Sequence, residues 1–437
     1  MSSDSKSKTF TQRGWDPAWL AKALADPTRP VFLAGCVPPR EGTAEVQSME
    51  ICQKFCDRAR CLATDGFTIY DIQDEASRTA ETRPFPFRRT LPPEEFAGLF
   101  PLLSGKGTVV YKSVGEEDSE GFQSWLSRSM GVHGCSAFNI VGAASSSAEV
   151  KLKVPDAASL MIKANASFGC VCIAERHLTR RSEHLNMLRK QQMGAAWFIS
   201  QAVYDADATV QLLQDYGELC RSRGMQPAKV VLTFAPCGRP KTMQFIKWLG
   251  IAMPADVEHR VEAAAVTSKQ AAVNESIKIC SEALSTILER SSGTGVPLGI
   301  NVESVSGFRE EIDGVFELFR QLQHLMLDAR GVPWGVRWYR VPVGSLTRSA
   351  SEQELFRLEA ELEEKRKALA SIKKSNRISG AATPLDIKQP NDEPASGPLQ
   401  KAISLTPMPI GCLVAGALLG FVLTALSGVR VKFVRAE

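Results

Sequence analysis

The sequence lacks the residue patterns that mark the common kinds of metal site. Its 437 residues include eleven cysteines, but no two of them form a CxxC pair, and none has the histidine or cysteine partners that a zinc site needs. Four of the five histidines form no ligand spacing with cysteines or carboxylates: His133, His184, His259 and His324. We therefore expect no metal site, and we expect reduced thiols in a cytosolic compartment.

Nucleotide-binding loops, hydrolase motifs and nucleic-acid surfaces are missing as well. Gly293, Gly295 and Gly299 precede a predicted strand instead of following one, so they do not form a Rossmann fingerprint. The run at residues 105–108 lacks the upstream glycine of a phosphate-binding loop, and no GxSxG elbow is present. The net charge of +4 is modest, and no long Lys/Arg run is interleaved with aromatics. Nucleic acid is therefore not the expected partner.

One long hydrophobic run is present, at residues 408–429. It carries no charged side chain, and as a helix it would be roughly 33 Å long, close to the hydrocarbon thickness of a bilayer. The amino terminus has neither the apolar core nor the cleavage pattern of a signal peptide. We expect a single-pass carboxyl-terminal anchor that leaves the preceding chain on the cytosolic face of an organelle membrane.

Two questions about this anchor stay open from the sequence. The outer mitochondrial, peroxisomal and endoplasmic reticulum membranes are all compatible with the short basic tail. Gly416 and Gly420 have the GxxxG spacing that lets two membrane helices pack closely, so a homo-oligomer is one alternative. The other interpretation of the run is a buried core helix at the end of a soluble domain.

Short β-branched segments alternate with longer helical patterns between residues 30 and 305. This alternation is typical of βα units and a parallel sheet. Eight nearly continuous apolar segments, each followed by room for a helix, fit a closed (β/α)8 TIM barrel better than an open doubly wound sheet. The expected strands are residues 31–37, 67–72, 108–114, 137–143, 169–174, 195–201, 229–235 and 297–303.

The rest of the chain divides by composition. A helix at residues 308–328 should close the barrel, and residues 334–341 are predicted to form an added strand or packing segment. The barrel domain is predicted at residues 30–348, after an amino-terminal extension at residues 1–29. The expected parts beyond it are an amphipathic or coiled-coil helix at 349–375, a flexible linker at 376–407, the transmembrane helix at 408–429 and a basic tail at 430–437.

The stretch with the most candidate ligand-binding side chains surrounds the fifth and sixth predicted strands. Four of its polar residues would fall within an arc of about 120° on one helix: Glu183, Asn186, Arg189 and Lys190. One acidic, one amide and two basic groups on one face are suited to a ribose and a diphosphate. From the residues alone, the alternative is an ordinary solvated helix face.

This stretch resembles the methylenetetrahydrofolate reductase family, (β/α)8 flavoproteins that use FAD to pass a hydride from NAD(P)H to methylenetetrahydrofolate. The similarity covers most of residues 30–305 and is dense at residues 169–205. Its motifs are the helix pattern above, a histidine after the fifth strand at His177, and a sixth-strand Ile-Ser-Gln that ends at Gln201. Weaker likenesses are the VPPR at residues 37–40 and the WLGIAMP at residues 248–254.

The resemblance implies a role for each matched residue. Arg189 and Lys190 would hold phosphate oxygens of FAD, and Glu183 and Asn186 would hold its ribose or adenine groups. His177 would contact the same cofactor. These five residues are therefore the expected cofactor site.

The implied activity is the reduction of 5,10-methylenetetrahydrofolate to 5-methyltetrahydrofolate, with NAD(P)H as hydride donor and Gln201 against the ring of the folate-type substrate.

Two positions depart from the family, since Gly35 and Ser146 stand where it has acidic residues. Protonation of a folate nitrogen needs a donor within hydrogen-bond reach. Replacement acids suggested by the sequence are Asp71, Asp74, Glu75 and Glu41. The competing hypotheses are a noncatalytic membrane-tethered binding or scaffold protein on the same barrel, and an enzyme with a different acceptor.

Overall fold

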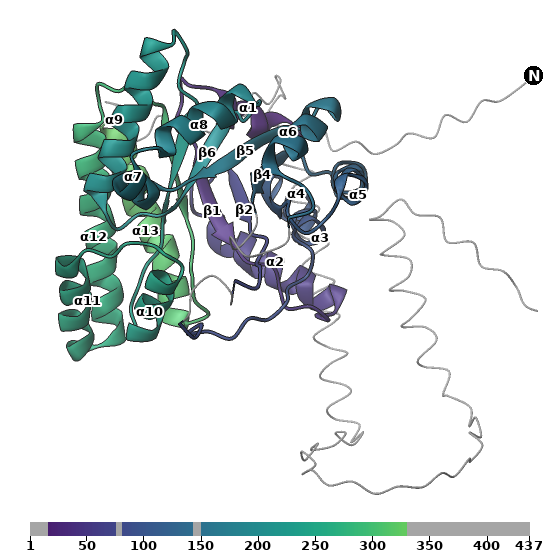
Figure 1. Ribbon diagram of the computed structural model, residues 1–437. Coiled ribbons are helices and arrows are strands. Elements are labelled where there is room, and N and C mark those ends of the chain that lie inside the picture. Colours follow the sequence, from purple (N-terminus) through teal and green to yellow (C-terminus); the bar gives the residue numbers. More distant parts are fainter. Residues whose placement is uncertain (1–15, 76–80, 143–149, 330–437) are drawn as a thin grey trace, which may run out of the picture. The chain divides into compact units, whose positions relative to one another are not determined.

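Eight parallel strands close into one barrel in the computed structural model, which describes residues 16–75, 81–142 and 150–329. Neighbouring strands pair in chain order, and β8 pairs with β1 to complete the ring. Figure 1 shows helices arranged around these strands. The strands are β1 (Phe32–Cys36), β2 (Gly66–Ile69), β3 (Thr108–Ser113), β4 (Ala137–Val141), β5 (Ser167–Cys172), β6 (Trp197–Ala202), β7 (Lys229–Phe234) and β8 (Leu298–Val302).

The predicted closed barrel is confirmed, and each observed strand overlaps its predicted range. Both faces of every strand are covered, one by the barrel interior and one by helices, which is why the strands read as nearly continuous apolar runs. On β1, for example, Phe32 packs in the layer between strands and helices, and Leu33 packs inside the barrel. The helix predicted at residues 308–328 is also present, as α13.

Thirteen helices lie in the described ranges, and most of them follow a strand and return the chain to the next one. They are α1 (Trp19–Ala25), α2 (Glu45–Ala59), α3 (Pro93–Ala97), α4 (Leu99–Ser104), α5 (Ser119–Gly131), α6 (Val154–Lys163), α7 (Ala174–Arg180), α8 (Glu183–Gln192), α9 (Ala206–Ser222), α10 (Pro240–Trp248), α11 (Ala255–Thr267), α12 (Lys269–Arg290) and α13 (Arg309–Asp328).

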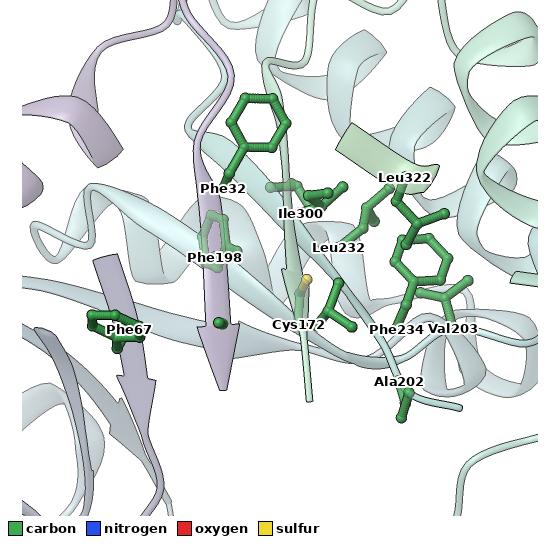
Figure 2. Close-up of a cluster of buried hydrophobic side chains, with 14 of the residues drawn as sticks. Phe32, Phe67, Cys172, Phe198, Ala202, Val203, Leu232, Phe234, Ile300 and Leu322 are labelled. Carbon is green, nitrogen blue, oxygen red and sulfur yellow. The ribbon is translucent and has the colours of Figure 1, made fainter. Parts of the chain in front are cut away.

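Two hydrophobic clusters hold the barrel together. The larger one fills the layer between strands and helices, and Figure 2 shows part of it, including Phe32, Phe234 and Ile300 from strands and Leu322 from α13. The smaller one fills the barrel interior, where Trp197 is fully buried. Burial of apolar area on this scale is the main source of folding free energy.

Helix α1 lies in the predicted amino-terminal extension and closes the amino-terminal end of the barrel. Leu20 and Leu24 belong to the interior cluster. Leu20 sits so close to Gly66 that a β-carbon at that glycine would lie 2.6 Å from its Cδ2 atom. The Lys229 ammonium donates to the carbonyl of Ala23 at 2.5 Å. The last residues of the amino-terminal extension are therefore part of the barrel core.

Several predictions fall outside the described residues. They concern the segment at 334–341, the helix at 349–375, the linker at 376–407, the membrane span at 408–429 and Ser146. Among the residues with a described structure, no helix combines the length and the apolar character needed to cross a membrane.

Candidate functional site

A cavity of about 320 Å³ opens at the carboxyl ends of the strands, the end that carries the active site in barrels of this type. Tyr70, just after β2, and Tyr111 on β3 line it, with ring centroids 4.8 Å apart. Burial raises the pKa of both phenols well above 10, so both keep their protons at neutral pH. The apolar part of the lining includes Ile140, Val141, Val171, Ile173, Leu249 and Ile251.

Glu303 places a carboxyl group in this cavity, directly after the end of β8. Burial raises the pKa of Glu303 to about 7, although a hydrogen bond with Tyr70 acts in the opposite direction. The Asn301 amide donates to the Tyr70 hydroxyl at 2.8 Å. Because Tyr70 stays protonated and already accepts from Asn301, its own hydrogen is the one donated to Glu303.

Gly35 makes the space that Glu303 and Tyr70 occupy. A β-carbon at position 35 would lie 2.8 Å from the Glu303 β-carbon and 2.9 Å from the Tyr70 ring. Such distances are far below normal contact between carbon atoms. The space beside position 35, where the resembling family has an acid, is therefore occupied here by the side chains of Glu303 and Tyr70.

The other acids suggested by the sequence are placed differently. Asp71 lines the cavity, but one of its oxygens accepts from the Ser113 backbone N–H and the other from the Gln73 amide, each at 2.8 Å. Burial raises its pKa. Glu75 also lines the cavity. Glu41 is exposed and is not part of the lining.

Gln201 and Lys190 are the two predicted site residues that line the cavity. A register shift between β6 and β7 occurs around Gln201, where the Ser200 hydroxyl donates to the Gln201 carbonyl at 2.7 Å and accepts from the Thr233 N–H at 2.9 Å. Bulges of this kind re-aim side chains next to binding sites. The Lys190 ammonium, from α8, donates to the Val171 carbonyl at 2.7 Å.

The other three residues predicted on α8 lie on one helix face and bond mainly to one another. Glu183 is buried; it accepts from the Ile173 N–H at 3.3 Å and from the Asn186 amide at 3.0 Å. The Asn186 oxygen in turn accepts from Arg189 at 2.6 Å. The predicted polar face therefore exists, and its contacts tie α8 to the end of β5. Its role in cofactor binding stays a prediction.

His177 lies away from the cavity, among α7, α8 and α9. It is fully buried, and its Nε2 atom lies 2.7 Å from an Asp215 oxygen that Arg181 also contacts at 3.1 Å. The His184 ring packs edge-on against it, with centroids 4.9 Å apart.

This cluster is one that sequence spacing could not reveal, because its residues come from separate helices. Ligand atoms of His177, His184 and Asp215 lie within 4.8 Å of one another. The Gln211 amide, however, donates to the second Asp215 oxygen at 2.9 Å, while Arg181 occupies the first. Both Asp215 oxygens are thus bonded, and the charge of this carboxylate is paired with that of Arg181. The cluster is therefore suited to holding the helices together.

A second, shallower cavity of about 240 Å³ adjoins the first. Both are lined by Ile173, Arg176 and Gln201, and the second adds Glu175, Thr179, Arg180 and Gly250. Arg176 and Arg180 lie on consecutive turns of α7. We call this second cavity the arginine shelf, because two guanidinium groups, those of Arg176 and Arg180, line it beside the single carboxyl of Glu175.

Comparison with known proteins gives one informative similarity. No family model matches the chain, and neither does any curated protein. Among solved structures it is similar to an uncharacterised protein from Clostridium thermocellum that binds two copies of 5-methyl-5,6,7,8-tetrahydrofolic acid. The identity is 28%, the TM-score is 0.59, and the match covers 70% of this chain and 99% of that one.

Two further solved structures are more distant. A 2,3-dimethylmalate lyase has 11% identity and a TM-score of 0.38, with 80% of this chain and 98% of that one covered. The dihydropteroate synthase of Thermus thermophilus has 13% identity and a TM-score of 0.36, with 69% and 96% covered. Similarities this low say nothing about activity.

Proposed function

We propose that the protein binds a reduced folate in the cavity at the carboxyl ends of its strands. The observation that carries the proposal is the combination of ring-sized space, paired tyrosines and a few polar side chains in that cavity, within a barrel similar to the 5-methyltetrahydrofolic acid-binding protein. Ligand sites are usually concave and mostly apolar, with a small number of polar groups that fix orientation.

The cavity suits one ring system. Its volume of about 320 Å³ is near the lower end of the roughly 300 to 1,000 Å³ common for small-molecule sites. Tyr70 and Tyr111 offer aromatic surface, and Gln201, Lys190 and Glu303 offer the polar contacts. A tetrahydropteridine combines a flat pyrimidine ring with several ring nitrogens, so it can use both kinds of group.

The arginine shelf suits the tail of a folate. A folate ends in one or more glutamates, whose carboxylates are anionic at neutral pH. Arg176 borders both cavities and Arg180 lies beside the second one, so a ring bound in the first would direct its tail toward both guanidinium groups. Arginine pairs with carboxylates through two parallel hydrogen bonds.

Titration of the full-length protein with 5-methyl-5,6,7,8-tetrahydrofolate, followed by intrinsic fluorescence, tests the proposal. We expect saturable binding that Gln201→Ala weakens at least tenfold. Gln214→Ala is the matched control, because Gln214 is exposed on α9 and is not part of the cavity lining. The double variant Arg176→Ala/Arg180→Ala should weaken a polyglutamylated folate more than a monoglutamate. Absence of saturable binding to the unaltered protein would contradict the proposal.

The finer prediction, hydride transfer from NAD(P)H through FAD to a folate, is a second and separate proposal. It is favoured by the position of Lys190, which lies both on the predicted cofactor face and in the cavity lining. A flavin would supply hydride-transfer chemistry when bound. As placed, Glu183, Asn186 and Arg189 would have to exchange their contacts with one another for contacts with FAD, so we derive no step through it.

Visible absorbance and NAD(P)H oxidation test this second proposal. A flavin band that survives gel filtration, together with folate-dependent oxidation of NADH or NADPH, would support a reductase. A colourless protein that takes up no added FAD and oxidises neither nucleotide would contradict it. Folate binding by that colourless protein would then favour the noncatalytic binding or scaffold hypothesis.

A further inference from the structure

Glu303 differs from two nearby acidic residues, Asp71 and Glu183, in how its oxygens are used. Asp71 has both oxygens bonded within the protein, and Glu183 accepts from a backbone N–H and from Asn186. Glu303 has a side-chain hydrogen bond with Tyr70 and otherwise faces the cavity. A carboxylate has about four acceptor positions, so acceptor capacity is left on the cavity side.

The surrounding residues hold this carboxyl in one place. The Glu303 backbone N–H donates to the Phe234 carbonyl at 3.0 Å, and the Tyr70 N–H donates to the Cys36 carbonyl at 3.3 Å. A hydrogen-bond chain then runs from the Asn301 amide to the Tyr70 hydroxyl and on to Glu303. Gly35 leaves the space that both side chains fill. This is the rigid support that a recognition group needs.

We propose that Glu303 recognises the ring of the bound ligand by accepting paired hydrogen bonds from a planar N–H edge, such as the amino group and adjacent ring N–H of a pteridine. This inference rests on the proposed folate-binding function and names the residue that recognises the ring. Two parallel N–H donors match the two oxygens of a carboxylate, and bonds to an ionised acceptor are about twice as strong as neutral ones.

Recognition of this kind depends on pH, because only the ionised carboxylate accepts both bonds. Tyr70, after β2, is hydrogen-bonded to Glu303, and Tyr111 on β3 and Tyr204 after β6 lie near enough to interact with it electrostatically; burial raises the pKa of all three. All three phenols are therefore neutral at pH 6 to 8. Asp71, Glu75, Arg176 and Lys190 are the charged residues elsewhere in the lining. With the Glu303 pKa near 7, affinity should rise about tenfold between pH 6 and pH 8.

The test compares Glu303→Gln with the unaltered full-length protein. The probes are pterin, which has the ring without the tail, and p-aminobenzoyl-glutamate, which has the tail without the ring. We expect Glu303→Gln to weaken pterin binding by roughly ten- to a hundredfold and to remove its pH dependence. Binding of p-aminobenzoyl-glutamate should stay within about twofold. Glu262→Gln, at an exposed position on α11, is the matched control.

Tyr70→Phe keeps the inference testable if Glu303→Gln does not fold. Loss of the Tyr70 hydroxyl removes the bond that favours the ionised carboxylate, so the midpoint of the pH dependence should move upward by about half a unit or more. Unchanged pterin affinity in Glu303→Gln, or an unchanged midpoint in Tyr70→Phe, would overturn the inference while leaving folate binding intact. If the unaltered protein binds none of the folate probes, the proposed function and this inference both fail.

Discussion

At the scale of single residues, the cavity depends on the absence of a side chain at position 35. Gly35 is on β1, and the adjacent space is filled by the side chains of Tyr70 and of Glu303, which follows β8. The two strands are hydrogen-bonded neighbours because the barrel is closed. Position 35, where the sequence has a glycine and the resembling family has an acid, therefore has the acidic residue Glu303 beside it in the fold.

Gly35→Ala should destabilise the protein and weaken ligand binding together. The new β-carbon would press on Glu303 and Tyr70 at 2.8 and 2.9 Å, and overpacking of this kind costs about 1 to 3 kcal/mol. Urea denaturation measures the change in the free energy of unfolding. The control is Gly293→Ala, since a β-carbon there meets nothing within 4 Å. Equal stability of the two variants would show that the structure accommodates a β-carbon at position 35 without cost.

Glu303 should also make folding stability depend on pH. Its folded-state pKa of about 7 lies above the ordinary value of 4.5, so the folded state holds its proton more tightly than the unfolded chain does. The stabilisation is complete below about pH 4.5 and is lost as the pH rises to about 7. The expected loss is of the order of 3 kcal/mol relative to Glu303→Gln.

Parallel denaturation curves of the unaltered protein and Glu303→Gln between pH 4.5 and pH 8 measure this difference. Subtracting the two removes the contribution of other titrating groups. A constant difference across that range would mean that the carboxyl titrates normally and is well solvated.

At the scale of elements, α7 and α9 are joined by the contact between His177 and Asp215, and α8 packs on it through the His184 ring. His177→Ala should lower the free energy of unfolding by about 2 to 4 kcal/mol, because it leaves a cavity and removes a buried hydrogen bond. Folate affinity should stay within about twofold, since His177 is not part of the cavity lining. His259→Ala, at an exposed position on α11, should cost less than about 0.5 kcal/mol.

A different outcome would support the role implied by the family resemblance. If His177→Ala keeps the stability of the unaltered protein and loses flavin or folate binding, the residue contacts a ligand.

The strands could be predicted because the pattern that marks them lies within a few consecutive residues of the sequence. A buried parallel strand needs a continuous apolar run, and each of the eight runs stands out between helical segments. Gln201 and Lys190 were placed near the site by their match to motifs of the resembling family, and Gln201 also lies near the carboxyl end of a strand, where the strands of a barrel meet. The same rule points to Glu303, which directly follows the eighth strand.

Other features depend on contacts that sequence spacing does not contain. Glu183 and Arg189 share a helix face as predicted, but the partners they bond to follow from side-chain conformation. His177 and Asp215 meet only because α7 packs against α9. Helix α1 has seven residues, and a helix that short is stabilised by the barrel end that it covers more than by its own sequence.

At the scale of the whole molecule, the chain combines a barrel with a hydrophobic run at residues 408–429. We propose that this run anchors the protein in a membrane, and we expect the full-length protein to stay in the membrane fraction after alkaline carbonate extraction. A variant that ends at residue 375 should move to the soluble fraction and keep its folate affinity. Full-length protein in the soluble fraction would contradict the anchor.

The most direct test of the account is a crystal structure of the full-length protein with 5-methyl-5,6,7,8-tetrahydrofolate bound. We predict that the pteridine ring lies in the cavity beside Tyr70 and Gln201, with its N–H edge on Glu303 and its glutamate toward Arg176. A ligand bound elsewhere, with this cavity left empty, would contradict the central claim.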